Sequence, residues 1–265
     1  MSLSEEQIRT ALAAAVDPNT GKDFVAGKSL KNIKFDGSDV SFDIELGYPA
    51  KTQFDVIRQQ VIAAVRGVPG VGNVSANVYS KIVAHTVQMG VKLVPGVKNI
   101  IAVASGKGGV GKSTTAVNLA LALVQEGASV GILDADIYGP SQPQMLGLAG
   151  QQPESKDGEN MEPLEAYGLQ AMSIGFMVDV ETPMVWRGPM VAQALDQLIS
   201  QTNWRDIDYL IVDMPPGTGD IQLSLAQKVP VTGAVIVTTP QDIALIDARK
   251  GLKMFEKVGV PIVGI

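Results

Sequence analysis

Apolar and polar residues follow two different patterns along this chain, and the change between them divides it into two parts. In the first 80 residues, two segments carry apolar side chains every three or four positions, which predicts amphipathic helices. Other segments alternate strictly between apolar and polar residues, which predicts half-buried strands. The expected elements are a helix over 4–16, strands over 31–35 and 40–46, a helix over 54–65 and a strand over 74–78. This α-β-β-α-β order predicts a small α+β domain over residues 1–80.

After residue 98, short unbroken apolar runs replace the alternating pattern, as is typical of parallel strands buried on both faces. These runs cover 99–104, 130–133, 209–212, 234–237 and 262–265, and helices are expected over 114–125, 188–201 and 242–258. Their alternation predicts an α/β domain over 98–265 with a doubly wound, mostly parallel sheet, joined to the first domain by a linker over 81–97. The polar, Gly- and Pro-rich stretch 139–163 is expected to form a long mobile loop near the functional site.

Local signals mark where several of these elements begin or end. Ser4 and Gln7 form a capping-box pattern at the start of the first helix. Asp36-Gly37 is a turn signal between the first two strands, and Gly127 is expected to end the helix over 114–125. These signals agree with the periodicity, so the element order rests on two kinds of observation.

A glycine-rich run follows the first strand of the second domain and opens its first helix. Residues 106–113, Gly-Lys-Gly-Gly-Val-Gly-Lys-Ser, fit the phosphate-binding pattern G-x-x-x-x-G-K-[ST]. Glycine permits the backbone conformations in which successive N–H groups surround phosphate oxygens, whereas the alternative is a glycine-rich turn without a ligand. Lys112 is expected to reach the β- and γ-phosphates and Ser113 to bind Mg²⁺. The predicted nucleotide contacts are Gly106, Lys107, Gly108, Gly109, Val110, Gly111, Lys112, Ser113 and Thr114.

Three aspartates follow predicted strands at their carboxyl ends, where α/β domains place ligand chemistry. Asp213 follows the strand over 209–212 and fits a Walker-B aspartate that holds Mg²⁺. Asp134 and Asp136 follow the strand over 130–133, and we expect one of them in the metal shell and the other on the attacking water. The alternative for each is a capping or turn role. The glycine-rich run 213–220 is predicted to act as a switch that responds to the γ-phosphate.

Lys107 is an extra lysine in the glycine-rich run and has two interpretations. It is either a solvated surface lysine or a cation delivered to the nucleotide of a partner subunit, because a cation supplied in trans accelerates related phosphoryl transfers. The second interpretation makes it a catalytic residue beside Lys112 and Asp136 and implies a homodimer.

Composition excludes several other classes of protein. A net charge of −6 argues against a nucleic-acid partner, and no apolar run reaches the ~18 residues of a membrane span. The polar, acidic start is unlike a signal peptide, and the absence of cysteine excludes disulfides and thiolate metal sites, so a cytoplasmic protein is expected.

The single histidine, His85, is interpreted as a surface or linker residue. The methionines concentrated between Met145 and Met214 predict core packing, with an adaptable partner surface as the alternative.

The motifs together resemble a known class of enzymes. Residues 106–114 resemble the deviant Walker A loop of the MinD/ParA/nitrogenase-iron-protein class of P-loop ATPases. More narrowly, the motifs Leu-Asp-Ala-Asp-Ile-Tyr-Gly-Pro-Ser at 133–141, Trp-Arg-Gly-Pro at 186–189 and Asp-Met-Pro-Pro-Gly-Thr-Gly-Asp at 213–220 are similar to those of the Mrp/ApbC family of iron–sulfur cluster carrier ATPases. The N-terminal unit, with Asp17-Pro18 and Leu-Gly-Tyr-Pro-Ala at 46–50, resembles the small metal–sulfur cluster biosynthesis domain often fused to them.

This resemblance implies a homodimeric ATPase that uses ATP and Mg²⁺, hydrolyses ATP slowly, and passes iron–sulfur clusters to apoproteins together with assembly factors. By the resemblance, Lys107 contacts the nucleotide across the dimer, and Asp136 positions the hydrolytic water. Lys112 and Ser113 bind phosphate and Mg²⁺, and the resemblance places Asp134 and Asp213 in the metal shell. Arg187 belongs to a motif that is typical of the family. The residue type and its position in the sequence do not by themselves predict a role for it.

One departure from the family pattern concerns the cluster itself. The family places a Cys-x-x-Cys pair shortly after the strand equivalent to 262–265, where thiolates from two subunits bridge an iron–sulfur cluster. This chain has no cysteine and stops at Ile265, so we expect no iron–sulfur ligand in it and expect it to be C-terminally truncated. The asparagine that reads adenine in relatives also lies past this point, which leaves the choice between ATP and GTP open.

Two other functions remain open from the sequence. A MinD/ParA-type spatial regulator would need an amphipathic membrane-binding tail or a basic DNA-binding surface, and neither is visible in the sequence. A non-catalytic scaffold would bind nucleotide and recruit iron–sulfur client proteins through the N-terminal domain. The leading interpretation is the cluster carrier ATPase, with neither a membrane nor a nucleic-acid partner.

Overall fold

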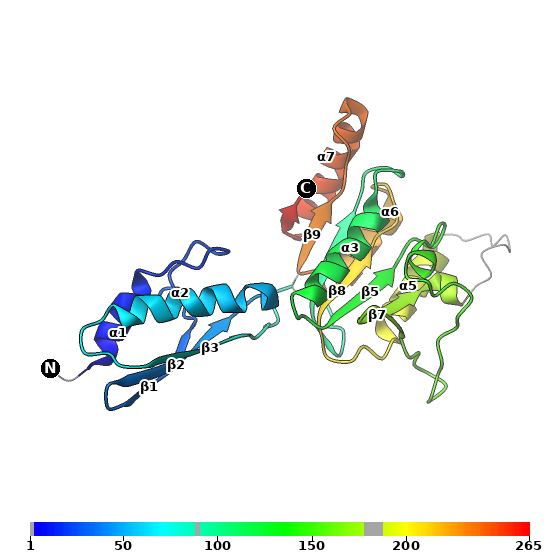
Figure 1. Ribbon diagram of the computed structural model, residues 1–265. Helices are drawn as coiled ribbons and strands as arrows, with labels where there is room; N and C mark the ends of the chain where they lie inside the picture. Colours follow the sequence, from blue (N-terminus) through cyan, green and yellow to red (C-terminus); the bar gives the residue numbers. More distant parts are fainter. Residues whose placement is uncertain (1–2, 88–90, 178–187) are drawn as a thin grey trace. The chain divides into compact units, whose positions relative to one another are not determined.

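The computed structural model describes residues 3–87, 91–177 and 188–265 (Figure 1). The chain divides into two compact units. The smaller unit contains Met1–Val83 with Gln125–Gly127, and the larger contains Ala84–Val124 with Ala128–Ile265. Among the described residues, no helix is both long enough and apolar enough to cross a membrane.

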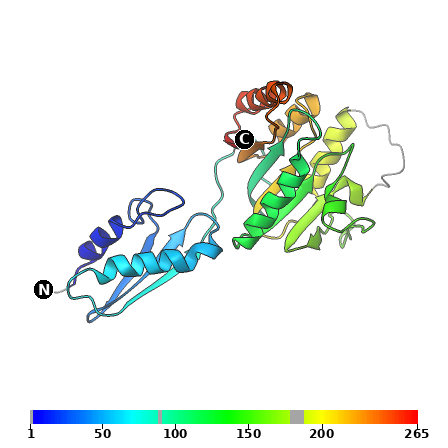
Figure 2. The same ribbon diagram turned by 45° about the horizontal axis from the view of Figure 1, so that its top comes forward.

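Two helices cover one face of a sheet in the smaller unit (Figure 2). Its elements are α1 (Glu5–Ala13), β1 (Leu30–Asp36), β2 (Asp39–Leu46), η1 (Lys51–Gln53), α2 (Phe54–Arg66) and β3 (Val74–Ser80). Among the described residues the sheet has the order β1-β2-β3, with β1 antiparallel and β3 parallel to β2. The predicted α-β-β-α-β order is confirmed, with the short η1 turn added before α2.

The local signals in the smaller unit act as the sequence predicts. Gln7 N donates to Ser4 Oγ at 3.3 Å and Ser4 N donates to Gln7 Oε1 at 3.0 Å, which completes the capping box at the start of α1. Along β2 every second side chain is buried, and α2 buries its apolar stripe. The fully buried residues of that stripe are Ile57, Val61 and Val65. Each such side chain contributes about 1.5–3 kcal/mol by leaving water, which is why periodicity alone predicted these elements.

The larger unit is the predicted doubly wound domain. Its elements are β4 (Val97–Ala104), α3 (Lys112–Gln125), β5 (Val130–Asp134), α4 (Gln142–Met145), β6 (Leu164–Ala166), β7 (Leu169–Ser173), η2 (Ile174–Phe176), α5 (Gly188–Ser200), β8 (Ile207–Asp213), α6 (Asp220–Lys228), β9 (Gly233–Ile236), α7 (Asp242–Lys257) and β10 (Ile262–Gly264). Among the described residues the sheet order is β10-β9-β4-β8-β5-β7-β6, parallel throughout except for the β6–β7 pair. α5 packs on α6 and α6 on α7, whereas α3 lies on the opposite face of the sheet (Figure 1).

The structure corrects several sequence expectations in this unit. α3 begins at Lys112, two residues before the expected start, and the sequence pattern did not predict β6, β7 and α6. The stretch 139–163 is also not purely a loop. It contains α4, and Leu146 and Leu148 are buried in the core of the unit. Burial of these two leucines in the core anchors the stretch, because removing their side chains from water stabilises its position.

Candidate functional site

The carboxyl ends of three neighbouring strands lie beside the glycine loop, which we define as residues 106–111. This loop joins β4 to α3, and β4, β8 and β5 are adjacent and parallel. In this register Asp134, the last residue of β5, is the Cα partner of Asp213, the last residue of β8. Strand pairing therefore brings together two aspartates that belong to separate motifs in the sequence.

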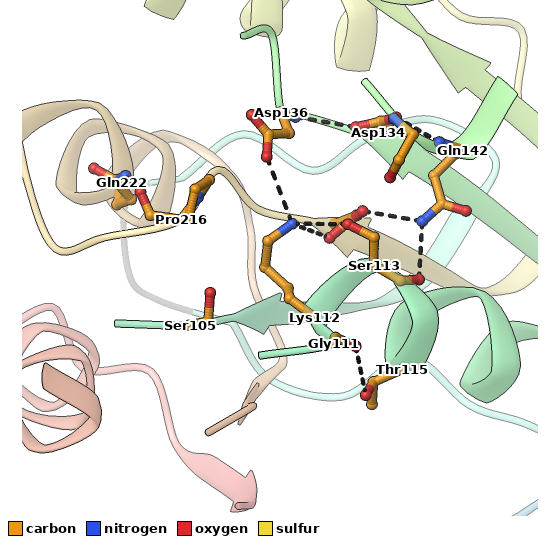
Figure 3. Close-up of polar contacts among 12 residues, drawn as sticks. Ser105, Gly111, Lys112, Ser113, Thr115, Asp134, Asp136, Gln142, Pro216 and Gln222 are labelled. Carbon is orange, nitrogen blue, oxygen red and sulfur yellow. Dashed lines mark hydrogen bonds and ion pairs between the residues drawn. The ribbon is translucent and has the colours of Figure 1, made fainter. Parts of the chain in front are cut away.

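Lys112, the first residue of α3, places its ammonium group among acidic side chains (Figure 3). Its Nζ donates to the carboxylate of Asp213 and to Ser113 Oγ at 3.2 Å, and it lies 3.9 Å from Asp136 Oδ2. The Lys112 and Asp213 side chains are 7% and 0% exposed. An ion pair removed from water in this way interacts more strongly than a surface pair. In this conformation protein carboxylates therefore hold the predicted phosphate-binding lysine in place.

The backbone of the glycine loop has the form that its sequence requires. Gly109 and Gly111 have φ values of +77° and +88°, in the left-handed region that favours glycine. A Cβ on Gly106 would collide with the backbone of Asp247 in α7, so the start of the loop fits closely against that helix. The Gly111 carbonyl accepts hydrogen bonds from Thr115 N at 2.9 Å and Thr115 Oγ1 at 3.0 Å, which fixes the loop to the first turn of α3.

The other predicted nucleotide contacts differ in exposure. The exposed positions are Gly108, Gly109, Gly111 and Thr114, and the half-buried ones are Gly106, Lys107, Val110 and Ser113. Ser105 Oγ donates to the Lys107 carbonyl at 2.9 Å, which orients the backbone at the start of the loop. Among the described residues, no carboxylate lies within ion-pair distance of the Lys107 ammonium. The role of Lys107 in trans stays a prediction.

Asp134 is fully buried, and its carboxylate accepts three backbone hydrogen bonds. Asp136 N donates to Oδ1 at 3.1 Å, and Ser141 N and Gln142 N each donate to Oδ2 at 2.9 Å. Burial, followed by the negative charge of Asp213, raises the pKa of Asp134 to about 7. These contacts correspond to the alternative that the sequence left open for this residue, a turn aspartate that organises the chain before α4. Its place in a metal shell stays a prediction.

Asp136 lies two residues beyond β5, and its Oδ2 is 3.9 Å from Lys112 Nζ (Figure 3). Its side chain is 14% exposed, so water reaches it more readily than it reaches Asp134 or Asp213. Burial raises its pKa, and the Lys112 charge opposes that rise. A partly accessible carboxylate beside a cation is suited to holding and orienting a water molecule.

The predicted switch run, residues 213–220, is attached to the strand that precedes the glycine loop. Met214 N donates to Val103 O at 3.0 Å, and Gly217 N donates to Ser105 O at 2.8 Å. Gly217 has a φ of +103°, a conformation that other residues rarely adopt. The backbone of this run is therefore attached to the segment that leads into the glycine loop, and its role as a switch stays a prediction.

Gln142 is a residue of this site that the sequence pattern did not reveal. It is the first residue of α4 and is 1% exposed. Its Nε2 donates to Asp213 Oδ2 at 2.9 Å and to the Ser113 carbonyl at 3.1 Å (Figure 3). The signal available in the sequence was its position, directly after the 133–141 motif and within a stretch that was expected to be a loop.

Three further expectations have mixed outcomes. His85 is exposed and contacts Asn99 Oδ1 through its backbone N at 3.0 Å and its ring Nδ1 at 2.9 Å, in keeping with a linker residue. Met172 and Met214 are buried in the core as expected. Other methionines, Met161, Met177 and Met190, line a cavity of about 420 Å³ instead. Arg187 and its motif lie outside the described residues except for Gly188 and Pro189 at the start of α5.

The donor set of this site fits a magnesium–nucleotide complex. The hydroxyl of Ser113 and the carboxylate of Asp213 both contact Lys112, and hard oxygen donors of this kind suit Mg²⁺. Among the described residues, no group of three His, Cys, Asp or Glu side chains is arranged to hold a metal ion. Mg²⁺ takes one or two carboxylates and completes its shell with substrate phosphates and water.

Family models match both parts of the chain. A model described as the NUBPL iron-transfer P-loop NTPase matches residues 96–265, and one described as an iron–sulfur cluster assembly protein matches residues 5–78.

Curated relatives extend this similarity. An iron–sulfur cluster carrier protein of Pseudomonas fragi is 60% identical over 76% of this chain and 71% of its own. The iron–sulfur cluster carrier protein of Escherichia coli is 48% identical over 99% of this chain and 72% of its own. Among solved structures, a nucleotide-binding protein of Archaeoglobus fulgidus in complex with ADP is 38% identical, with a TM-score of 0.56, over 64% of this chain and 66% of that one. The chain thus spans about 70% of the length of these bacterial relatives.

Proposed function

The chain belongs to the family of NUBPL iron-transfer P-loop NTPases, and we propose that it binds and slowly hydrolyses ATP to drive iron–sulfur cluster transfer as a homodimer. The observation that carries the proposal is the meeting of Lys112, Ser113, Asp136 and Asp213 beside the glycine loop. These residues come from three separate segments of the chain, and each matches a different requirement of phosphoryl transfer.

The glycine loop and α3 form the phosphate site. Loop N–H groups and the positive end of the α3 dipole attract the phosphates, and Lys112 pairs with the β- and γ-phosphate oxygens. The phosphates then compete with Asp213 and Asp136 for the Lys112 ammonium, which these carboxylates hold close to the site. Nucleotide binding therefore rearranges the ion pairs of the site as well as filling it.

Ser113 and Asp213 would hold Mg²⁺, which neutralises the charge that develops on the phosphate oxygens. Asp136 orients the attacking water, since it is the most accessible of the three carboxylates and lies beside Lys112. Lys107 reaches the nucleotide of the partner protomer, a contribution worth about 10³–10⁵ in rate in related enzymes.

The cluster is cargo in this proposal. Relatives named iron–sulfur cluster carrier proteins support that role, and the match of residues 5–78 to a model described as an iron–sulfur cluster assembly protein supports a part in it for the smaller unit. The 265 residues contain no cysteine, so thiolates for the cluster do not come from them. Apoproteins and assembly factors are the expected partners, and the cytoplasm is the expected compartment because it keeps their thiols reduced.

Nucleotide titration by calorimetry tests the proposal. The protein should bind Mg·ATP, and Lys112→Ala should weaken binding by about a hundredfold or more, because a charge-assisted phosphate contact is lost in a buried site. Lys253→Ala, at an exposed lysine of α7, is the matched control and should bind like the wild type. Equal binding by the Lys112 variant would refute the assignment of the site, and competition by GTP decides base preference.

The dimer is tested separately by the ATPase rate. A partner-supplied lysine requires turnover per protomer to rise with protein concentration, and Lys107→Ala should abolish that rise while leaving ATP binding within a few-fold. A rate that is independent of concentration in the wild type, from a protein that stays monomeric with ATP, would contradict the role in trans.

A further inference from the structure

Gln142 occupies an unusual position for its residue type. It is almost completely buried between α3 and β8, although glutamine side chains are mostly exposed in folded proteins. Its neighbour in the same short helix, Gln144, is exposed as expected. A specific set of hydrogen bonds therefore holds Gln142 at this place.

The amide of Gln142 contacts both residues assigned to Mg²⁺, Asp213 through its carboxylate and Ser113 through its backbone carbonyl. Its Nε2 donates to Asp213 Oδ2 at 2.9 Å and to the carbonyl of Ser113 at 3.1 Å. Both partners are acceptors, so the NH₂ group must face them, and a reversed amide would place oxygen against oxygen. Lys112 donates to Asp213 Oδ1, the other oxygen of that carboxylate. Asp213 is thus held from two sides, by a cation and by an amide.

The same residue is anchored at its backbone. Gln142 N and Ser141 N both donate to Asp134 Oδ2 at 2.9 Å. Gln142 consequently connects the start of α4 with the end of β5, the end of β8 and the first turn of α3 (Figure 3). Any shift of Asp213 or Ser113 on binding a cation is transmitted through this amide to α4.

Two buried oxygen atoms at the start of α4 lack a hydrogen-bond partner among the described residues. These atoms are Gln142 Oε1 and Ser141 Oγ. Unpaired buried polar atoms are uncommon in proteins.

We propose that Gln142 is a positioning residue for Mg²⁺. It orients Asp213 toward the cation and couples occupation of the metal site to the position of α4 and the chain that follows it. The proposal rests on the proposed function, because it assigns Gln142 to the Mg²⁺ site of a nucleotide-binding protein.

The test compares Gln142→Leu and Gln142→Glu with Gln144→Leu as the matched control. The leucine has a similar volume without the amide, and the glutamate keeps the shape but turns an acceptor toward Asp213. Nucleotide affinity is measured first in EDTA and then across a Mg²⁺ titration. Protease protection of the chain after α4, residues 146–163, is followed in the same samples.

Both Gln142 variants should bind nucleotide in EDTA as the wild type does, yet need about tenfold more Mg²⁺ for half-saturation, as is usual when a residue supporting a metal ligand is lost. They should also lose the Mg²⁺-dependent protection of 146–163, whereas Gln144→Leu should keep both properties. An unchanged Mg²⁺ requirement, or equal weakening with and without Mg²⁺, would overturn the proposal. Failure of the wild type to bind nucleotide would instead overturn the proposed function.

Discussion

Two buried aspartates, one in each unit of the molecule, are accommodated in opposite ways. Asp17 in the smaller unit is 4% exposed and accepts from neutral donors, namely the Tyr48 hydroxyl at 2.7 Å, Thr20 Oγ1 at 2.9 Å and Asn19 N at 2.9 Å. Asp213 in the larger unit is fully buried and depends on the charge of Lys112. The first environment is hydrogen-bonded throughout, whereas the second combines like charges with unpaired polar atoms.

This difference separates a structural carboxylate from a functional one. A buried carboxylate whose hydrogen bonds all come from neutral groups of the protein rigidifies its surroundings and requires no ligand. Around Asp213, the pKa of Asp134 is raised to about 7, and Gln142 Oε1 has no partner among the described residues. Folding alone does not remove the energetic cost of the neighbouring carboxylates and of the unpaired oxygen, so such clusters are typical of sites that bind a ligand.

The largest expected effect comes from removing the cation beside Asp213. Lys112→Met should destabilise the larger unit by about 3–5 kcal/mol, because it leaves a buried carboxylate unpaired. Adding Asp213→Asn removes that charge and should restore most of the stability without restoring nucleotide binding. Both tryptophans follow residue 98, so urea unfolding monitored by tryptophan fluorescence reports on this unit. A Lys112→Met protein as stable as the wild type would mean that the ion pair is energetically neutral.

The next effect concerns pH and Asp134. Its pKa is about 7 when folded against an ordinary value of 3.8, so between these values the folded state binds more protons than the unfolded chain. Unfolding free energy should therefore fall as pH rises from about 4 to 7, by on the order of a few kcal/mol, and then level off. Asp134→Asn cannot ionise and should flatten this slope in the same fluorescence assay. Parallel slopes for the two proteins would show that Asp134 is ionised throughout.

The smallest effect belongs to the neutral network of the smaller unit. Tyr48→Phe removes one donor to Asp17 while Thr20 and Asn19 remain, so we expect a loss of about 1 kcal/mol, as for one hydrogen bond. Hydrogen exchange over residues 5–80 measures this change, and Mg·ATP affinity should stay at the wild-type value. A large loss of nucleotide affinity would contradict the structural role assigned to Asp17.

Local sequence signals predicted the elements that depend on neighbouring residues. The capping box of Ser4 and Gln7, the alternation along β2 and the apolar stripe of α2 each follow from contacts within a few residues. The strands β4, β5 and β8 could likewise be predicted, because strands buried in a parallel sheet have continuous apolar sequences.

Elements that depend on distant partners were missed or misjudged. β6 is three residues long and pairs antiparallel with β7 at the sheet edge, so it carries no periodic signal. α4 has four residues and is held by Asp134, a contact that the sequence does not reveal. The three backbone hydrogen bonds of Asp134 are likewise set by the path of the chain after β5, while its expected place in a metal shell stays a prediction.

The order of residues defines the chemistry that is available: a glycine loop, one lysine and one serine at its end, and aspartates after two strands. How these groups meet depends on the folded chain, because β8 pairs with both β4 and β5 and so places Asp213 beside Asp134 and Lys112. Folding also makes an amide, that of Gln142, supply the remaining contact to Asp213. Residue types set which interactions can form, but burial and strand order set which of them do form, since electrostatic and hydrogen-bond energies depend on distance and exclusion of water.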